Sequence, residues 1–185
     1  MSMQDHIILN ELYNAGDDSC KKQGVDSHDT DMRIFSCTLC QNIAYLVINY
    51  VSQVLNGGHS QWIDNGYYKE DGEHLIRALK HIDGVWCRKV INLIHKANAQ
   101  HDIDTHVEEH EWDSISEELD KLDTEFYDFE EEFLLEVETW VKKKITQKSS
   151  GPWYVKDYDD GIHGPFYSLE DAEDNAELVH GIVTS

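Results

Sequence analysis

Residues 108–138 have the sequence EEHEWDSISEELDKLDTEFYDFEEEFLLEVE, in which fifteen carboxylates accompany one side-chain cation, Lys121. The same stretch keeps apolar residues at steps of three or four, namely Ile115, Leu119, Leu122, Phe126, Phe129 and Phe133. This spacing is typical of an amphipathic helix, whereas a disordered acidic segment lacks such a stripe. The stretch therefore predicts folded helices that display negative charge at fixed spacings.

The charge of the whole chain limits the classes of partner. The 185 residues include 37 Asp and Glu against 15 Lys and Arg, for a formal net charge of −22, and 40% of residues are hydrophobic. The apolar content predicts a folded protein. The negative charge argues against nucleic acid or an anionic membrane as a direct ligand, because both are themselves anionic. We therefore expect a basic protein partner.

Three features favour a cytoplasmic protein. No apolar run reaches the ~18 residues that a membrane span needs, and the first residues lack the cationic start of a signal peptide. Four cysteines do not make a disulfide scaffold in a chain of this length.

The positions of the apolar residues predict a mainly α fold. Helices are expected at residues 6–13, 32–55, 73–82, 85–99, 114–127 and from there to about residue 145. The fifth of these begins at Ser114, which forms a capping-box pattern with Glu117. Residues 16–31 are polar and are predicted to form a loop.

The C-terminal part of the chain differs in composition. Gly151 and Pro152 end the helical pattern, and two short apolar segments flank the turn sequence at residues 159–161. Ser168 then precedes a further helical pattern. We therefore expect a bundle-like helical domain at residues 1–148 and a small appendage at residues 149–185, a β-hairpin plus a helix that packs on it.

Two short motifs raise the question of metal or redox chemistry. His106, Glu109 and His110 match H-x-x-E-H, a spacing that places two histidines on one helical face for zinc. Their neighbours are polar, with almost no apolar residue to shield a metal, which favours a solvated segment. Cys37 and Cys40 have C-x-x-C spacing inside a buried helical pattern, so we expect core thiols. No cofactor, metal site or catalytic residue is predicted.

The most distinctive local sequence follows the helix at residues 32–55. Asn56, Gly57, Gly58, Gln61, Trp62 and Asn65 match the pattern of a helix ending in Asn-Gly-Gly, followed by Gln, an aromatic residue and Asn. The pattern resembles the signature of the bacterial family that includes DNA mimic protein nineteen. Leu55 stands where that family has a further Asn, and His59 stands where it has an aromatic residue.

The resemblance covers roughly residues 32–145 and implies a mostly helical fold, a homodimer and a structural role for the six motif residues. In the protein that gives the family its name, surface acids imitate DNA phosphates and occupy the DNA-binding face of a transcription factor. The resemblance thus implies a bacterial or phage protein of this kind.

The acidic stretch and the resemblance together predict a non-enzymatic inhibitor. It would bind the basic nucleic-acid-binding surface of a transcription factor, nuclease or defence protein. The predicted contacts are Asp113, Glu117, Glu118, Asp120, Asp123, Glu125, Asp128, Glu130, Glu131, Glu132, Asp157, Asp159 and Asp160.

Two alternatives stay open. An immunity protein that neutralises a specific toxin would rely on aromatic anchors such as Trp153, Tyr154, Phe166 and Tyr167, and would bind with little dependence on salt. A zinc-dependent hydrolase would use the H-x-x-E-H residues and would carry stoichiometric zinc.

Overall fold

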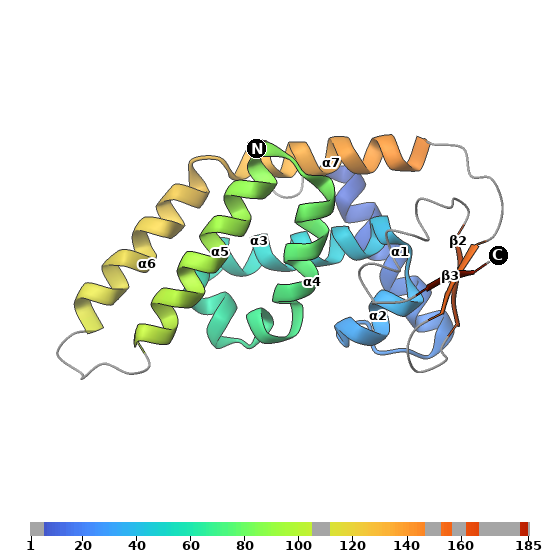
Figure 1. Cartoon of the computed structure of the whole chain (residues 1–185), viewed down its shortest axis with the longest axis horizontal. Helices are drawn as coiled ribbons and strands as arrows, with labels where there is room; N and C mark the ends of the chain where they lie inside the picture. The colour runs from blue at the N-terminus through green and yellow to red at the C-terminus, as the bar shows by residue number, and fades with distance from the viewer. Residues whose placement is uncertain (1–5, 105–111, 147–152, 157–161, 167–181, 185) are drawn as a thin grey trace. The chain divides into compact units, whose positions relative to one another are not determined.

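The computed structural model describes residues 6–104, 112–146, 153–156, 162–166 and 182–184, and the side chains of residues 6–102 and 117–146 (Figure 1). Seven helices lie in these residues: α1 Ile7–Gln23, α2 Thr30–Ser36, α3 Leu39–Asp64, α4 Tyr67–Ile82, α5 Val85–Asp104, α6 Trp112–Tyr127 and α7 Glu130–Thr146. Three short strands follow: β1 Trp153–Lys156, β2 Ile162–Phe166 and β3 Ile182–Thr184. The predicted mainly α fold class is confirmed.

The chain divides into two compact units. Unit 1 consists of Met1–Ile48 and Glu138–Ser185, and unit 2 is Asn49–Val137. The limits of the units fall inside α3 and α7 rather than in a linker. The predicted division into residues 1–148 and 149–185 stays a prediction, because most of the C-terminal segment lies outside the described residues.

Unit 2 is built around a cluster of aromatic side chains. Here α5 lies against both α4 and α6 (Figure 1). The Tyr50 ring packs edge-on against Trp62 and Phe126, with ring centroids 5.1 and 5.4 Å away. All three side chains are buried. Phe129 and Phe133 extend the cluster, as the apolar stripe of the acidic stretch predicts.

A backbone break interrupts α3 where a helix end was predicted. Gly57 and Gly58 leave the helical conformation, and Gly58 has φ of 76° and ψ of −178°. A Cβ atom at Gly58 would lie 2.0 Å from Asp123 Oδ2. Glycine is required here by both the backbone angle and the close carboxylate. A second helical segment follows at once and runs on to Asp64, so the break divides α3 into two helical segments at the predicted position.

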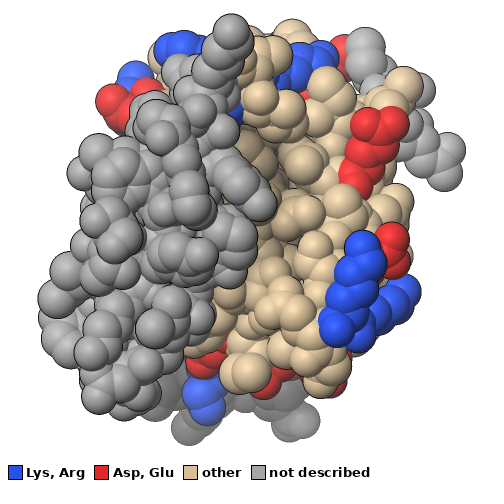
Figure 2. All heavy atoms as spheres, turned by 90° about the vertical axis from the view of Figure 1, so that its right-hand side faces the viewer, with Lys and Arg blue, Asp and Glu red and all other residues tan. Residues whose placement is uncertain are grey.

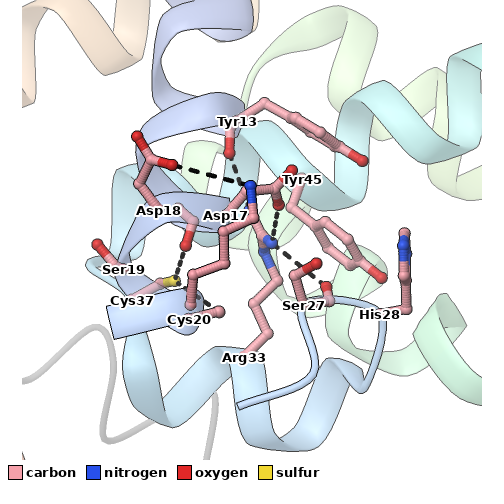
Figure 3. Close-up of polar contacts among 12 residues, drawn as sticks. Tyr13, Asp17, Asp18, Ser19, Cys20, Ser27, His28, Arg33, Cys37 and Tyr45 are labelled. Carbon is pink, nitrogen blue, oxygen red and sulfur yellow. Dashed lines mark hydrogen bonds and ion pairs between the residues drawn. The ribbon is translucent and has the colours of Figure 1, made fainter. Parts of the chain in front are cut away.

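In unit 1, a buried arginine explains why α1 is longer than predicted (Figure 3). The Arg33 guanidinium donates to Asp17 Oδ1 at 2.6 Å and to the Tyr13 carbonyl at 3.1 Å, and it stacks over the Tyr45 ring. A Cβ atom at Gly16 would lie 2.4 Å from this guanidinium. The predicted loop at residues 16–31 is therefore wrong over its first half, where polar residues form the last turns of α1 around a buried cation.

The helix predicted at residues 32–55 also begins differently. Cys37 is extended, with φ of −125° and ψ of 157°, and separates α2 from α3. The Thr38 N–H donates to Gln41 Oε1 at 2.9 Å, and the Gln41 N–H donates to Thr38 Oγ1 at 3.4 Å. This reciprocal pair is a capping box that starts α3, and continuous apolar periodicity concealed it in the sequence.

The C-terminal strands form a three-stranded sheet in the order β2-β1-β3. Strand β1 pairs antiparallel with both β2 and β3. The predicted turn around Asp159 and the helix after Ser168 lie outside the described residues. The appendage as a whole therefore stays a prediction.

We expect Gly58→Ala to lower the free energy of unfolding by about 3 kcal/mol, because it adds backbone strain and a clash with the Asp123 carboxylate. Gly24→Ala is the matched control. Gly24 also has positive φ, 71°, but nothing lies within 4 Å of its added Cβ, so a loss of about 1 kcal/mol is expected. Urea unfolding followed by circular dichroism measures both, and equal losses would contradict the proposed clash.

Candidate partner-binding surface

The helices of the acidic stretch separate its carboxylates into an outward and an inward group. Leu119, Phe126, Phe129 and Phe133 are buried, as the predicted stripe requires. Opposite this stripe, seven acids on α6, between the helices and on the first turn of α7 are exposed: Glu117, Glu118, Asp120, Glu125, Asp128, Glu131 and Glu132. We call these seven residues the acidic face. Glu130 is half-buried.

The charge spacing on α6 resembles that of a nucleic-acid strand. Four carboxylates of the acidic face lie between Glu117 and Glu125, about 12 Å along the helix axis at ~1.5 Å per residue. Three intervals separate the four carboxylates, so they lie on average ~4 Å apart along the axis, against ~3.4 Å between charges along a single strand of duplex DNA.

One cation lies within the acidic face. Lys121 Nζ forms an ion pair with Glu118 Oε1. The hydrogen bond to Glu118, and then its charge, raise the pKa of Lys121. Both side chains are more than half exposed, so this pair contributes little to stability. Its main effect is to cancel one of the negative charges.

Asp123 was predicted to lie on the partner-binding surface, but it is buried and bonded within unit 2. Its side chain is 12% exposed. Asp123 Oδ1 accepts from the His59 backbone N–H at 2.9 Å and lies 2.5 Å from His59 Nδ1. The Asp123 carboxylate accepts a hydrogen bond from the backbone N–H that follows the glycine break in α3. It is buried in this bond and so cannot also face a partner.

A buried chain of three polar side chains runs through unit 2. Burial, together with the Asp123 carboxylate, raises the pKa of Tyr50 well above its ordinary value. The Tyr50 hydroxyl is hydrogen-bonded to His59 Nε2, 2.8 Å away, and His59 Nδ1 faces the Asp123 carboxylate. The order of the three groups resembles a catalytic triad, but His59 and Tyr50 are fully buried.

Two further acids of the stretch cap helix N-termini. In unit 2, the Glu136 carboxylate accepts from the backbone N–H groups of the first three residues of α5, each at 2.9 Å. In unit 1, Glu138 is buried and accepts from the Ile8 N–H at 3.2 Å, at the start of α1. A carboxylate in this position satisfies free amides and favours the helix dipole.

The family-motif residues occupy the break in α3, consistent with the predicted structural role. Trp62 is buried against Tyr50 and Tyr68. Polar bonds join the rest: Asn56 Nδ2 donates to Gln61 Oε1, and both Gln61 and Asn65 donate to Gln53 Oε1. His59 still acts as an aromatic ring, because it packs edge-on against Tyr50 and Phe126.

Several predicted residues have no described side chain. Asp113 lies on α6, but its side chain is not described, and Asp157, Asp159 and Asp160 lie outside the described residues. His106, Glu109 and His110 of the H-x-x-E-H pattern also lie outside them. In the part of the chain that is described, no group of three His, Cys, Asp or Glu is placed to hold a metal ion. Cys37 and Cys40 are buried thiols, as predicted.

Acidic residues are not spread evenly over the described surface. On the face drawn in Figure 2, uncharged residues cover most of the described area, and Asp and Glu lie mainly toward its edges. None of the described helices is both long enough and apolar enough to cross a membrane.

These features define an acidic, mainly α-helical protein with a glycine break in α3 and exposed carboxylates opposite the buried apolar stripe of α6 and α7. The DMP19-like protein family matches residues 37–144, which is more than half of the chain. The chain therefore belongs to the DMP19-like family. No curated protein and no solved structure matches it.

We expect Asp123→Asn to lower the free energy of unfolding by about 1–3 kcal/mol, because both His59 donors bond to the single oxygen Oδ1, and a neutral amide oxygen there accepts more weakly than a carboxylate. Asp120→Asn is the matched control. Asp120 is exposed on the same helix, so a change within ~0.5 kcal/mol is expected. Similar losses in the two variants, measured by urea unfolding, would contradict the division into inward and outward acids.

Proposed function

We propose that this protein is a non-enzymatic inhibitor whose acidic face imitates DNA phosphates and occupies the basic nucleic-acid-binding surface of a protein partner. The single observation that carries the proposal is the placement of the seven exposed carboxylates on the side of α6 and α7 opposite their buried apolar stripe. Membership of the DMP19-like family supports it, because the family is named after a DNA mimic.

The packing of α6 supports a surface that is ready to bind. The acids of the face stand on a helix whose opposite side is anchored by Leu119, Phe126 and the bonded Asp123. Their spacing is set before a partner arrives, so little backbone order has to be gained on binding. Arg and Lys of the partner would form charge-assisted hydrogen bonds with these carboxylates, as they do with phosphates.

The net charge of the chain supports rapid recognition. At −22, it attracts a basic partner from a distance, and the association rate falls as salt screens the field. The same charge repels nucleic acid, so competition for the shared partner is the mechanism of inhibition.

A charge-neutralised variant tests the proposal. The full chain is immobilised, nucleic-acid-binding proteins of the native host are captured and identified, and each is purified for titration. Replacing Glu117, Asp120, Glu125 and Asp128 by Gln or Asn should weaken the affinity at least 100-fold, because four charge-assisted contacts are lost.

The control variant makes the same change in net charge elsewhere. Glu11, Asp18, Asp26 and Glu70 are exposed and lie outside the acidic face, so neutralising them should weaken binding less than about fivefold, through long-range attraction alone. Equal losses in the two variants would show that net charge, and not this face, recognises the partner.

Competition and salt give an independent measurement. Duplex DNA should displace this protein from its partner, and the affinity should fall at least tenfold between 50 and 200 mM salt, since exposed charges are screened over ~10 Å. Binding that resists both DNA and salt would contradict mimicry and would favour a toxin-specific immunity protein with aromatic anchors.

A further inference from the structure

We propose that Cys20 and Cys37 form an oxidisable pair, a modification site at which a peroxide converts two thiols to a disulfide that fixes α1 to the junction between α2 and α3. This inference is independent of the proposed inhibitor function. It rests on the placement of the two sulfur atoms within unit 1.

The two sulfur atoms are in contact although they come from different elements (Figure 3). Cys20 lies near the end of α1, and Cys37 lies in the extended residue between α2 and α3. Their Sγ atoms are 3.7 Å apart. A modest change in side-chain rotation and local backbone would bring them to the ~2.05 Å of a disulfide.

The backbone of Cys37 is extended and is not fixed by helical hydrogen bonding. Its backbone belongs to neither helix, and its thiol donates to the Gly16 carbonyl at 3.4 Å. Cys37 is 5% exposed and Cys20 is 0% exposed. The next residues along the chain, Thr38 and Lys21, are exposed, so the pair lies just beneath the surface and Cys37 is the thiol that an oxidant reaches first.

The chemistry balances with hydrogen peroxide as the oxidant. The Cys37 thiolate attacks one peroxide oxygen, the O–O bond breaks, and the departing hydroxide takes a proton to become water. The Cys20 thiolate then attacks the sulfur of the resulting sulfenic acid, the S–S bond forms, and a second water leaves. The two thiols lose two electrons in total, and the peroxide gains them.

The reaction is slow at neutral pH, and this sets its pH dependence. Burial, and then the charge of Cys20, raise the pKa of Cys37 to about 12. Roughly one thiol in 10⁵ is ionised at pH 7, and only the thiolate reacts. The rate should therefore rise about tenfold for each unit of pH between 7 and 9. The pair responds to sustained oxidation and not to a brief pulse.

The experiment uses the full chain, first reduced and then treated with excess hydrogen peroxide. Remaining thiols are alkylated, and the intact mass and the proteolytic peptides are measured. We expect two of the four thiols to resist alkylation, a loss of two hydrogen atoms, and a linked peptide containing Cys20 and Cys37. Closing a segment of 17 residues should raise the thermal midpoint by about 5–10 °C, and a reductant should reverse the shift.

The other cysteines provide matched controls. Cys40 and Cys87 are also buried, and the variants Cys40→Ala and Cys87→Ala should keep the oxidation product, whereas Cys20→Ala and Cys37→Ala should lose it. Peptide mapping of the unaltered chain decides the matter even if a variant fails to fold. Four alkylated thiols after oxidation, a link between another pair, a sulfinic acid at Cys37, or an unchanged thermal midpoint would overturn the proposal.

Discussion

The bond between the Asp123 carboxylate and the backbone amide of His59 is the constraint on which unit 2 depends. A helix that breaks at two glycines exposes backbone groups inside a core, and each must find a partner. Asp123 supplies that partner from α6, and it also orients His59 for its bond to Tyr50. The aromatic cluster then packs around a polar chain whose groups are all satisfied, which explains how a charged residue persists at the centre of the unit.

The same short stretch therefore carries two kinds of carboxylate. Asp123, Glu136 and Glu138 are bonded to backbone amides at the start of helical segments. The acidic face has no comparable burial. Inward carboxylates lower the cost of keeping so much negative charge in one folded chain, because each is held by positive helix ends. The outward carboxylates are exposed and add self-repulsion, and Lys121 pairs with one of them, Glu118.

Much of the fold follows from apolar periodicity, but two kinds of detail do not. The end of α6 at Tyr127 and the buried apolar stripe were predictable, because apolar residues at steps of three or four indicate an amphipathic helix. The division of the acids was not, since Asp120 and Asp123 look alike in sequence and only the position of the glycine break gives one of them a buried amide to accept from. Likewise, the last turns of α1 are polar. They supply carbonyl and carboxylate acceptors to the buried Arg33 guanidinium, and no local sequence pattern reveals this long-range contact.

The Arg33 cluster has a consequence for how the protein can be divided. The family match begins at residue 37, after Arg33 and the whole of α1. Tyr45 lies within the match, yet its ring is covered by the Arg33 guanidinium. A fragment limited to residues 37–144 would lack both Arg33 and its ion-pair partner Asp17. The Tyr45 ring would then be exposed. The packing of Tyr45 thus depends on residues that precede the family match, and recombinant work on this protein should retain its first 36 residues.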